Sequence, residues 1–142
     1  MDITEVRRRV RAVIDQAKRG AAARRERTDA ASREYEAFLQ ERAIPTFHSF
    51  AAALVAEGAR FKVFTPAGAV RLAAEGGGED YIEIVLDSTL DPPRPMGHSS
   101  RARGRRTIVT ERSIRAGTPT ADLTAEDVLD FLVEEVTPFV ER

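Results

Sequence analysis

Cysteine and tryptophan are absent from this 142-residue chain, and only two histidines are present. Without a thiol, the chain cannot form a disulfide, a thiolate zinc site or a cysteine nucleophile. Aromatic residues make up 6% of the sequence, so it offers few platforms on which bases or sugars would stack. The polar chemistry that remains is mainly that of arginine and carboxylate side chains.

Long apolar runs are missing as well. The longest uncharged apolar run, residues 49–56, has eight residues, whereas ~20 are needed to cross a bilayer. The first residues, MDITEVRRRVRAV, mix acids and arginines where a secretory signal would have an apolar stretch. We therefore expect a cytoplasmic protein with no membrane partner. The length suits one domain, for which ~100–150 residues is usual.

Charge is unevenly distributed along the chain, although the formal net charge is only −1. Residues 1–45 carry 11 basic and 8 acidic side chains, which gives +3. Residues 117–142 carry seven acids and one arginine, which gives −6. This asymmetry is consistent with an acidic C-terminal segment that faces the basic parts of the chain within the fold.

The N-terminal segment has helical periodicity. Apolar residues recur every three or four positions, as they do on one face of an amphipathic helix: Ile3, Val6, Val10, Val13, Ile14 and Ala17. An unbroken helix over residues 3–43 would be ~60 Å long, longer than the ~37 Å diameter of a compact chain of this size. The helix therefore either breaks near Gly20 or residues 28–29 into a hairpin, or projects. The alanine-rich middle favours projection.

The remaining sequence predicts an α+β fold. Pro45 marks a boundary between residues 1–45, a long helix and possible oligomerisation arm, and residues 46–142, an α+β core domain. We expect a helix over residues 46–57 and strands at 60–65, 69–75, 81–87 and 106–114. The predicted architecture has two layers within a single globular unit. In it, a three- to four-stranded antiparallel meander sheet is covered on one face by helices, with a long N-terminal helix or helical hairpin.

The alternation of apolar residues also predicts the core. The sheet is expected to bury one face against the 46–57 and C-terminal helices: Phe61, Val63, Val70, Leu72, Ile82, Ile84 and Leu86. The C-terminal helix begins at a capping box formed by Thr124 and Asp127, and Pro138 should kink or end it. Its expected apolar stripe is Val128, Leu129, Leu132, Val136, Phe139 and Val140.

Motifs that would support catalysis or a cofactor are weak. Gly76, Gly77 and Gly78 precede a strand and lack the following Lys-Ser/Thr of a phosphate loop, so we interpret them as a hairpin loop. His48 lies among phenylalanines on a predicted helix. His98 follows a flexible-looking stretch and precedes two serines, where a nucleophile would not be held in a fixed geometry. We therefore predict no catalytic residues and no enzyme.

A metal site has little support either. Asp87, Asp91 and His98 are the only grouping that invites one, and their spacing matches no recurring zinc or calcium site. The two aspartates are better explained as turn formers at a strand end. We predict no metal and no cofactor.

Residues 88–104 contain three prolines and two glycines and show no periodicity. We expect residues 90–104 to be a poorly ordered tether that can be shortened without loss of the fold. Arginines at 94–106 make this segment the main alternative site, because they would bind an anion by counterion release. The candidate anion-binding residues are Arg101, Arg103, Arg105 and Arg106.

The sequence thus favours a non-enzymatic protein-interaction or oligomerisation module. Its expected partner is a second copy of itself, in a homodimer formed through the N-terminal helix. The candidate interface residues are Val6, Val10, Val13 and Ala17. The alternative is a binder of nucleic acid or of another anionic partner, such as an acidic protein, that uses the Arg94–Arg106 segment with the N-terminal helix.

Overall fold

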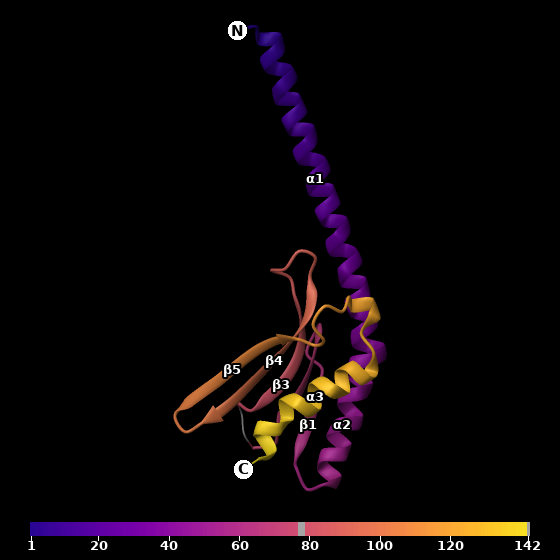
Figure 1. The fold of residues 1–142 in the computed structure, drawn as a ribbon, viewed down its shortest axis with the longest axis vertical. Coiled ribbons are helices and arrows are strands. Elements are labelled where there is room, and N and C mark those ends of the chain that lie inside the picture. The colour runs from indigo at the N-terminus through magenta and orange to yellow at the C-terminus, as the bar shows by residue number, and fades with distance from the viewer. Residues whose placement is uncertain (77–78, 142) are drawn as a thin grey trace.

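The computed structural model describes residues 1–76 and 79–141 and has the predicted α+β class. Two helices, joined by a π-helical turn, precede a five-stranded antiparallel sheet, and a 3-10 turn leads into a C-terminal helix (Figure 1). The sheet therefore has more strands than the three or four predicted. The elements are α1 (Ile3–Phe38), η1 (Leu39–Ala43), α2 (Ile44–Ala56), β1 (Phe61–Phe64), β2 (Ala69–Ala74), β3 (Tyr81–Asp87), β4 (Arg94–Arg103), β5 (Arg106–Ser113), η2 (Thr120–Asp122) and α3 (Ala125–Val140).

Helix α1 is continuous and projects from the body of the protein (Figure 1). Asp2 caps its start by accepting a hydrogen bond from the Thr4 N–H, at 3.0 Å. No break occurs at Gly20 or at residues 28–29. Of the two alternatives left open by the length of the segment, the projecting helix is the one formed.

The helical segment does not end at Pro45, because the chain stays helical from α1 into α2. The five residues of η1 form a π turn, and Pro45 lies in the first turn of α2. In a regular helix the proline ring would clash with the carbonyl four residues earlier. The wider turn directly before Pro45 makes room for the ring. Proline also lacks a backbone N–H, but in the first turn of a helix this group would have no intrahelical acceptor, so little is lost.

The sheet is a meander of order β1-β2-β3-β4-β5, with every neighbouring pair antiparallel. The β2–β3 pairing confirms a hairpin, although Gly77 and Gly78 of its loop lie outside the described residues. The tether prediction for residues 90–104 is wrong. Most of them form β4, which pairs with β3 and β5 and buries Pro95, Gly97 and Ser99.

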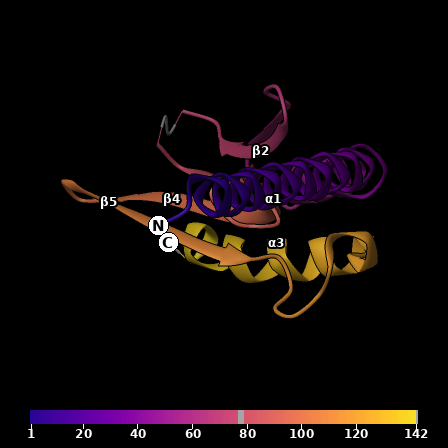
Figure 2. The same ribbon diagram turned by 90° about the horizontal axis from the view of Figure 1, so that it is seen from above.

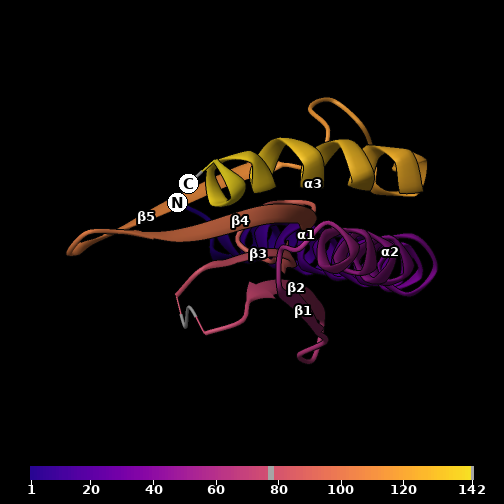
Figure 3. The same ribbon diagram turned by 90° about the horizontal axis from the view of Figure 1, so that it is seen from below.

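The core lies between one face of the sheet and the helices. Helix α3 crosses the sheet with α1 and α2 beside it (Figures 2 and 3). Most of the predicted sheet residues are buried, and Val63 and Leu86 pack at the margin. Residues near the end of α1 and in η1 also enter the core: Ala31, Tyr35, Phe38, Leu39 and Ala43.

Tyr35 links α1 to the sheet. Its hydroxyl donates to the Gly68 carbonyl at 2.7 Å, and burial raises the pKa of the phenol, so the group stays protonated. We expect Tyr35→Phe to lower the free energy of unfolding by about 0.5–1.5 kcal/mol, because it removes only the hydroxyl, with its bond to Gly68 and a longer one to the Ile84 carbonyl at 3.4 Å. Urea denaturation checks this value. An unchanged midpoint of denaturation would show that water bonds the carbonyl in place of the tyrosine hydroxyl, with no loss of stability.

Helix α3 begins at the predicted capping box. Asp127 N–H donates to the Thr124 hydroxyl at 3.1 Å, and Thr124 N–H donates to the Asp127 carboxylate at 2.9 Å. Pro138 lies inside the helix near its end and does not terminate it. The predicted stripe is partly wrong, because Leu129 and Val140 are 42% and 48% exposed. No described helix is both long and apolar enough to span a bilayer.

The Asp127 carboxylate of the capping box makes the stability of the fold depend on pH. Burial alone would raise the pKa of Asp127, but hydrogen bonds from Thr124 and Arg115 outweigh it and hold the pKa below the ordinary 3.8. A depressed folded pKa contributes stability above the unfolded value, and this contribution is lost as the pH falls through the folded value. We expect Asp127→Asn to destabilise the protein at pH 7 and less so below pH ~4. Thermal melts across this range test it, and a gap that does not depend on pH would contradict it.

Candidate functional site

The N-terminal part of α1 makes no hydrogen bond or ion pair with the described residues of the body. Ala21 and Arg24 border a pocket that residues 88–91 also line, and the first side chain to bond the body is Arg27, whose guanidinium bonds the Asp91 carboxylate at 3.3 Å and 3.4 Å. We define residues 3–20 as the arm. It is ~27 Å long at 1.5 Å per residue, and it points away from the sheet (Figure 1). The arm is therefore a helical surface that the described residues of the body leave exposed.

The arm carries the predicted interface stripe in full. Ile3, Val10 and Val13 are 73%, 52% and 68% exposed. Val6, Ile14 and Ala17 are exposed too. β-branched residues form helices less readily than alanine, leucine or arginine, because their side chains lose rotamer freedom. Helix formation therefore does not explain five such residues on one face, whereas contact with another apolar surface does.

Basic side chains border this stripe. At 100° per residue, Arg7, Arg11 and Lys18 follow one another along one side of it; we call them the basic edge. Glu5 lies elsewhere on the helix and bonds Arg8 and Arg9, at 2.6 Å and 3.0 Å. These two arginines hold the pKa of Glu5 below its usual value. The basic edge itself makes no ion pair with the described residues.

The candidate anion-binding arginines gather at the end of the β4–β5 hairpin. Arg101 and Arg103 lie on β4, Arg105 follows Gly104 in the turn, and Arg106 begins β5. Arg103 lies directly opposite Arg106 in the register. Like charges directly opposite each other disfavour strand pairing. The hairpin nevertheless carries four arginines at this end, so its tip has a local excess of positive charge that is mostly exposed.

A row of charged residues across the open face of the sheet was missed at the sequence level. Arg71 on β2, Glu83 on β3, His98 on β4 and Glu111 on β5 lie opposite one another in the register. Arg71 bonds Glu83 at 2.8 Å, a pair that alternation within β2 and β3 does indicate. His98 Nδ1 lies 3.9 Å from Glu83 and Nε2 lies 3.4 Å from Glu111. Only knowledge of β4 as a strand would have found the whole row.

This row is better explained as sheet packing than as catalysis. Arg71 stacks on the Tyr81 ring at 4.0 Å, which fixes the guanidinium beside Glu83. His98 and Ser99 are neighbours in a strand, so their side chains point to opposite faces. Ser99 hydrogen-bonds Thr110 on the helix-covered face. His48 is exposed on α2 and lies outside this row.

The residues considered for a metal do not converge. The Asp87 carboxylate accepts hydrogen bonds from the Thr89 N–H and hydroxyl, which hold the pKa of Asp87 low. Asp91 binds Arg27, and His98 lies in the charged row. Within the part of the chain that the structure describes, no three potential ligands are grouped around one point.

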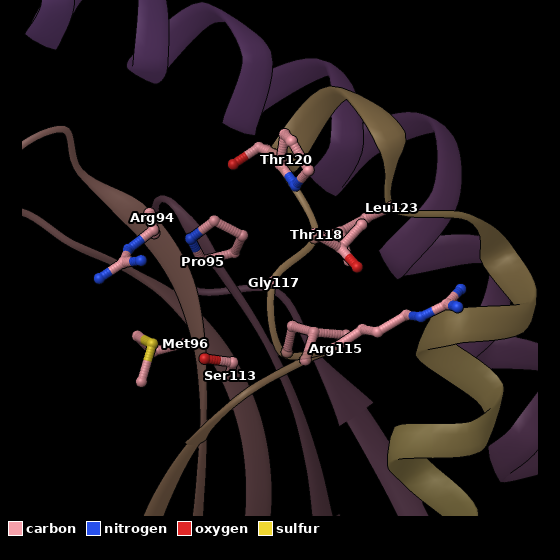
Figure 4. A pocket seen from close by; sticks show the side chains of 11 residues that line it. Arg94, Pro95, Met96, Ser113, Arg115, Gly117, Thr118, Thr120 and Leu123 are labelled. Carbon is pink, nitrogen blue, oxygen red and sulfur yellow. The ribbon is translucent and has the colours of Figure 1, made fainter.

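One further pocket, of about 280 Å³, lies between β4, the end of β5 and the loop before α3 (Figure 4). Arg94 and Arg115 belong to it, but Figure 4 shows them pointing to opposite sides. Arg115 reaches Asp127 at 3.0 Å. The groups left around the pocket are hydroxyls and apolar atoms, so no set of charged groups converges on a ligand.

The arm is thus the described surface whose composition most requires a contact outside the chain. The arginine tip is exposed but lacks apolar groups, and the charged row is paired within the sheet. Comparison with known proteins does not favour any one of these surfaces as a functional site, because no family model, curated protein or solved structure matches the chain.

Proposed function

We propose that this protein is a non-enzymatic interaction module that self-associates as a homodimer through its arm. The observation that carries the proposal is the exposed stripe of β-branched residues on a helix that nothing in the described chain covers. The body folds around residues from Ala31 onward, so its core does not need the arm. The projecting helix therefore serves contact with another molecule.

The size of the stripe suits self-association. Burying one Val or Ile side chain fully contributes ~1.5–3 kcal/mol, while association costs ~4–15 kcal/mol of translational and rotational freedom. One or two buried residues would not offset that cost. Two copies together contribute ten such residues, Ile3, Val6, Val10, Val13 and Ile14 from each, and this is enough.

A double substitution in the stripe tests the proposal. We expect Val10→Glu with Val13→Glu to convert a dimer into a monomer, because two carboxylates per chain would have to be buried unpaired. Light scattering after size exclusion reports the mass. Ala12→Glu is the control: it adds a carboxylate to the opposite, outward side of the same helix and should leave the dimer intact. A dimer that survives the double substitution would contradict the proposal.

The arginine tip supports a second candidate function, contact with a nucleic acid or another polyanion. Arg103 opposite Arg106 is the observation that favours it. We expect binding of a single-stranded oligonucleotide that weakens steeply with salt and is lost when Arg101, Arg103, Arg105 and Arg106 are replaced by serine. Melting should change little, because exposed ion pairs contribute below ~1 kcal/mol. Binding unchanged in this variant would exclude the tip.

A further inference from the structure

We infer that the surface covered by the arm is the outer face of α3 in a second copy of the chain, with the two helices antiparallel. This inference rests on the proposed function and names the partner surface of the same arm. A two-fold axis makes the contact twice, with each arm on the other copy's α3. The two sequence segments thereby brought together are the basic and acidic ends of the chain.

The outer face of α3 has its own uncovered apolar stripe. Leu129, Val133 and Val140 are 42%, 50% and 48% exposed. They lie on the side of α3 opposite Phe131, which is buried in the core, and Leu129 adjoins the buried Leu132 along the helix. Exposed apolar residues scattered singly need no explanation, but three on one helical line form a surface suited to another helix.

The spacing of the α3 stripe matches that of the arm. Along the arm, Ile3, Val10 and Ile14 are separated by seven and then four residues. Along α3 read backward, Val140, Val133 and Leu129 are separated by the same seven and four. An antiparallel pair therefore sets Ile3 level with Val140, Val10 with Val133 and Ile14 with Leu129. One register satisfies all three contacts.

Charge is complementary in the same register. Glu126, Asp130 and Glu134 follow one another along one side of the α3 stripe; we call them the acidic edge. Read antiparallel, Lys18 lies one residue from the level of Glu126, while Arg11 and Arg7 lie within a helical turn of Asp130 and Glu134. Glu126 and Asp130 make no ion pair with the described residues, and Glu134 is bound by Arg112. The basic edge thus meets acids that the chain leaves mostly unpaired.

Helix handedness decides the orientation. On both helices the charged edge lies on the same rotational side of the apolar stripe when viewed from the N-terminus. Two such helices packed in parallel place their charged edges on opposite sides of the contact, whereas antiparallel packing places them on the same side. Only the antiparallel arrangement therefore brings the basic edge against the acidic edge.

The C-terminal end of α3 adds a further attraction. Its last turn contains no basic residue, so the negative end of its dipole is not offset within the helix. In the antiparallel register the arginine-rich start of the arm lies beside this turn. The arm supplies the cations that the end of α3 lacks.

Pairing of two arms is the competing arrangement. In antiparallel arm pairs the two basic edges would face each other by the same handedness argument. In parallel pairs the basic edge would face Arg9 and Gln16 on the other side of the stripe. Both place arginine near arginine, which is unfavourable. The arm also runs away from α3 of its own chain, so docking within one chain does not occur in this fold (Figure 1).

The chain has no cysteine, so engineered cysteines test the register directly. Chains with Ile14→Cys and chains with Leu129→Cys are mixed at equal amounts and oxidised. We expect a disulfide between the two kinds of chain, because the register brings their Cβ atoms within the ~3.5–4.5 Å that a disulfide needs. Chains with Ile3→Cys mixed with Leu129→Cys chains are the control and should not cross-link, because these positions lie at opposite ends of the contact.

Each other outcome overturns the inference. A cross-link between two Ile14→Cys chains would show that arms pair with arms, which keeps the proposed function and removes α3 as its partner. Cross-linking of the Ile3→Cys control would show a parallel contact. A wild-type chain that is monomeric at every concentration would remove the proposed function as well. All three positions are exposed, so the folded state is preserved and melting verifies it.

Charge reversal provides an independent readout. Arg11→Glu and Asp130→Arg should each raise the dissociation constant several-fold, and combining them in one chain should restore it. Arg8→Glu is the matched control, because Arg8 lies away from the basic edge and bonds Glu5. If Asp130→Arg leaves the dimer unchanged, the acidic edge is not in the contact.

Discussion

Replacing Leu132 with alanine should lower the free energy of unfolding by about 2–5 kcal/mol, the range for truncating a large side chain in a packed core. Leu132 is fully buried at the centre of α3 and belongs to the cluster that joins this helix to the sheet and α2. Ile84, fully buried on β3, should respond to alanine in the same way. Both losses combine the transfer of apolar atoms to water with the cavity left behind.

Leu129→Ala is the matched control for this prediction. It removes the same atoms from the same helix, but from a side chain that is 42% exposed. In the chain lacking residues 1–20, which has no arm to dock on α3, equilibrium unfolding in urea should give a small change for Leu129→Ala and a large one for Leu132→Ala. Comparable midpoints for the two variants would mean that the inner and outer faces of α3 are wrongly assigned.

Adding one methyl group at Gly97 should also destabilise the fold, by about 1–3 kcal/mol or more. A Cβ at this position on β4 would lie 2.2 Å from Cε1 and 2.3 Å from Cζ of the Phe131 ring. Phe131 is itself buried and is contacted on another side by the Arg112 guanidinium. The ring therefore has little room to move, and the strand or helix must shift.

A second substitution identifies the cause of that loss. With Phe131→Leu in the same chain, Gly97→Ala should be less destabilising, because the smaller side chain vacates the space. Gly20→Ala is a control of opposite sign: the nearest atom to its added Cβ is Arg24 Nη1 at 3.7 Å. In a helix interior alanine is favoured over glycine by about 0.5–1 kcal/mol. Strictly additive losses at Gly97 and Phe131 would contradict the proposed clash.

Gly97 also explains why β4 could not be predicted from the sequence. Proline and glycine ordinarily interrupt strands, yet each has a specific place here. Pro95 lies before the point at which β5 begins to pair, at Met96, so it has a neighbouring strand on one side only. Gly97 is small because the Phe131 ring lies against the strand. Both reasons come from tertiary neighbours that a local pattern does not contain.

Other parts of the fold were accessible from local chemistry. The alternation in β2 and β3 identified the buried face of the sheet, and the capping box fixed the start of α3 within the chain. Helical period alone did not separate the two sides of α3, because apolar residues lie on both. Leu129 and Val140 were for this reason assigned to the core, although they face solvent.

The arm could be predicted mainly from the length of the N-terminal helical segment. A helix of that length is longer than the diameter of a compact chain of this size, so it must either project or fold back as a hairpin. The choice between them depended on whether Gly20 ends the helix, and one glycine is tolerated within a long helix at modest cost. What could not be predicted is the acidic, half-exposed face of α3, because its exposure depends on the complete packing.

The mass of the whole chain in solution, measured by sedimentation equilibrium over a dilution series, tests whether the arm mediates self-association. We expect twice the mass of one chain at the highest concentrations, with dissociation on dilution. We also expect a chain lacking residues 1–20 to have the mass of a single chain throughout and to retain the circular dichroism of the folded sheet. A full-length chain that stays monomeric at every concentration, or a shortened chain that dimerises equally well, would contradict the claim that the arm mediates self-association.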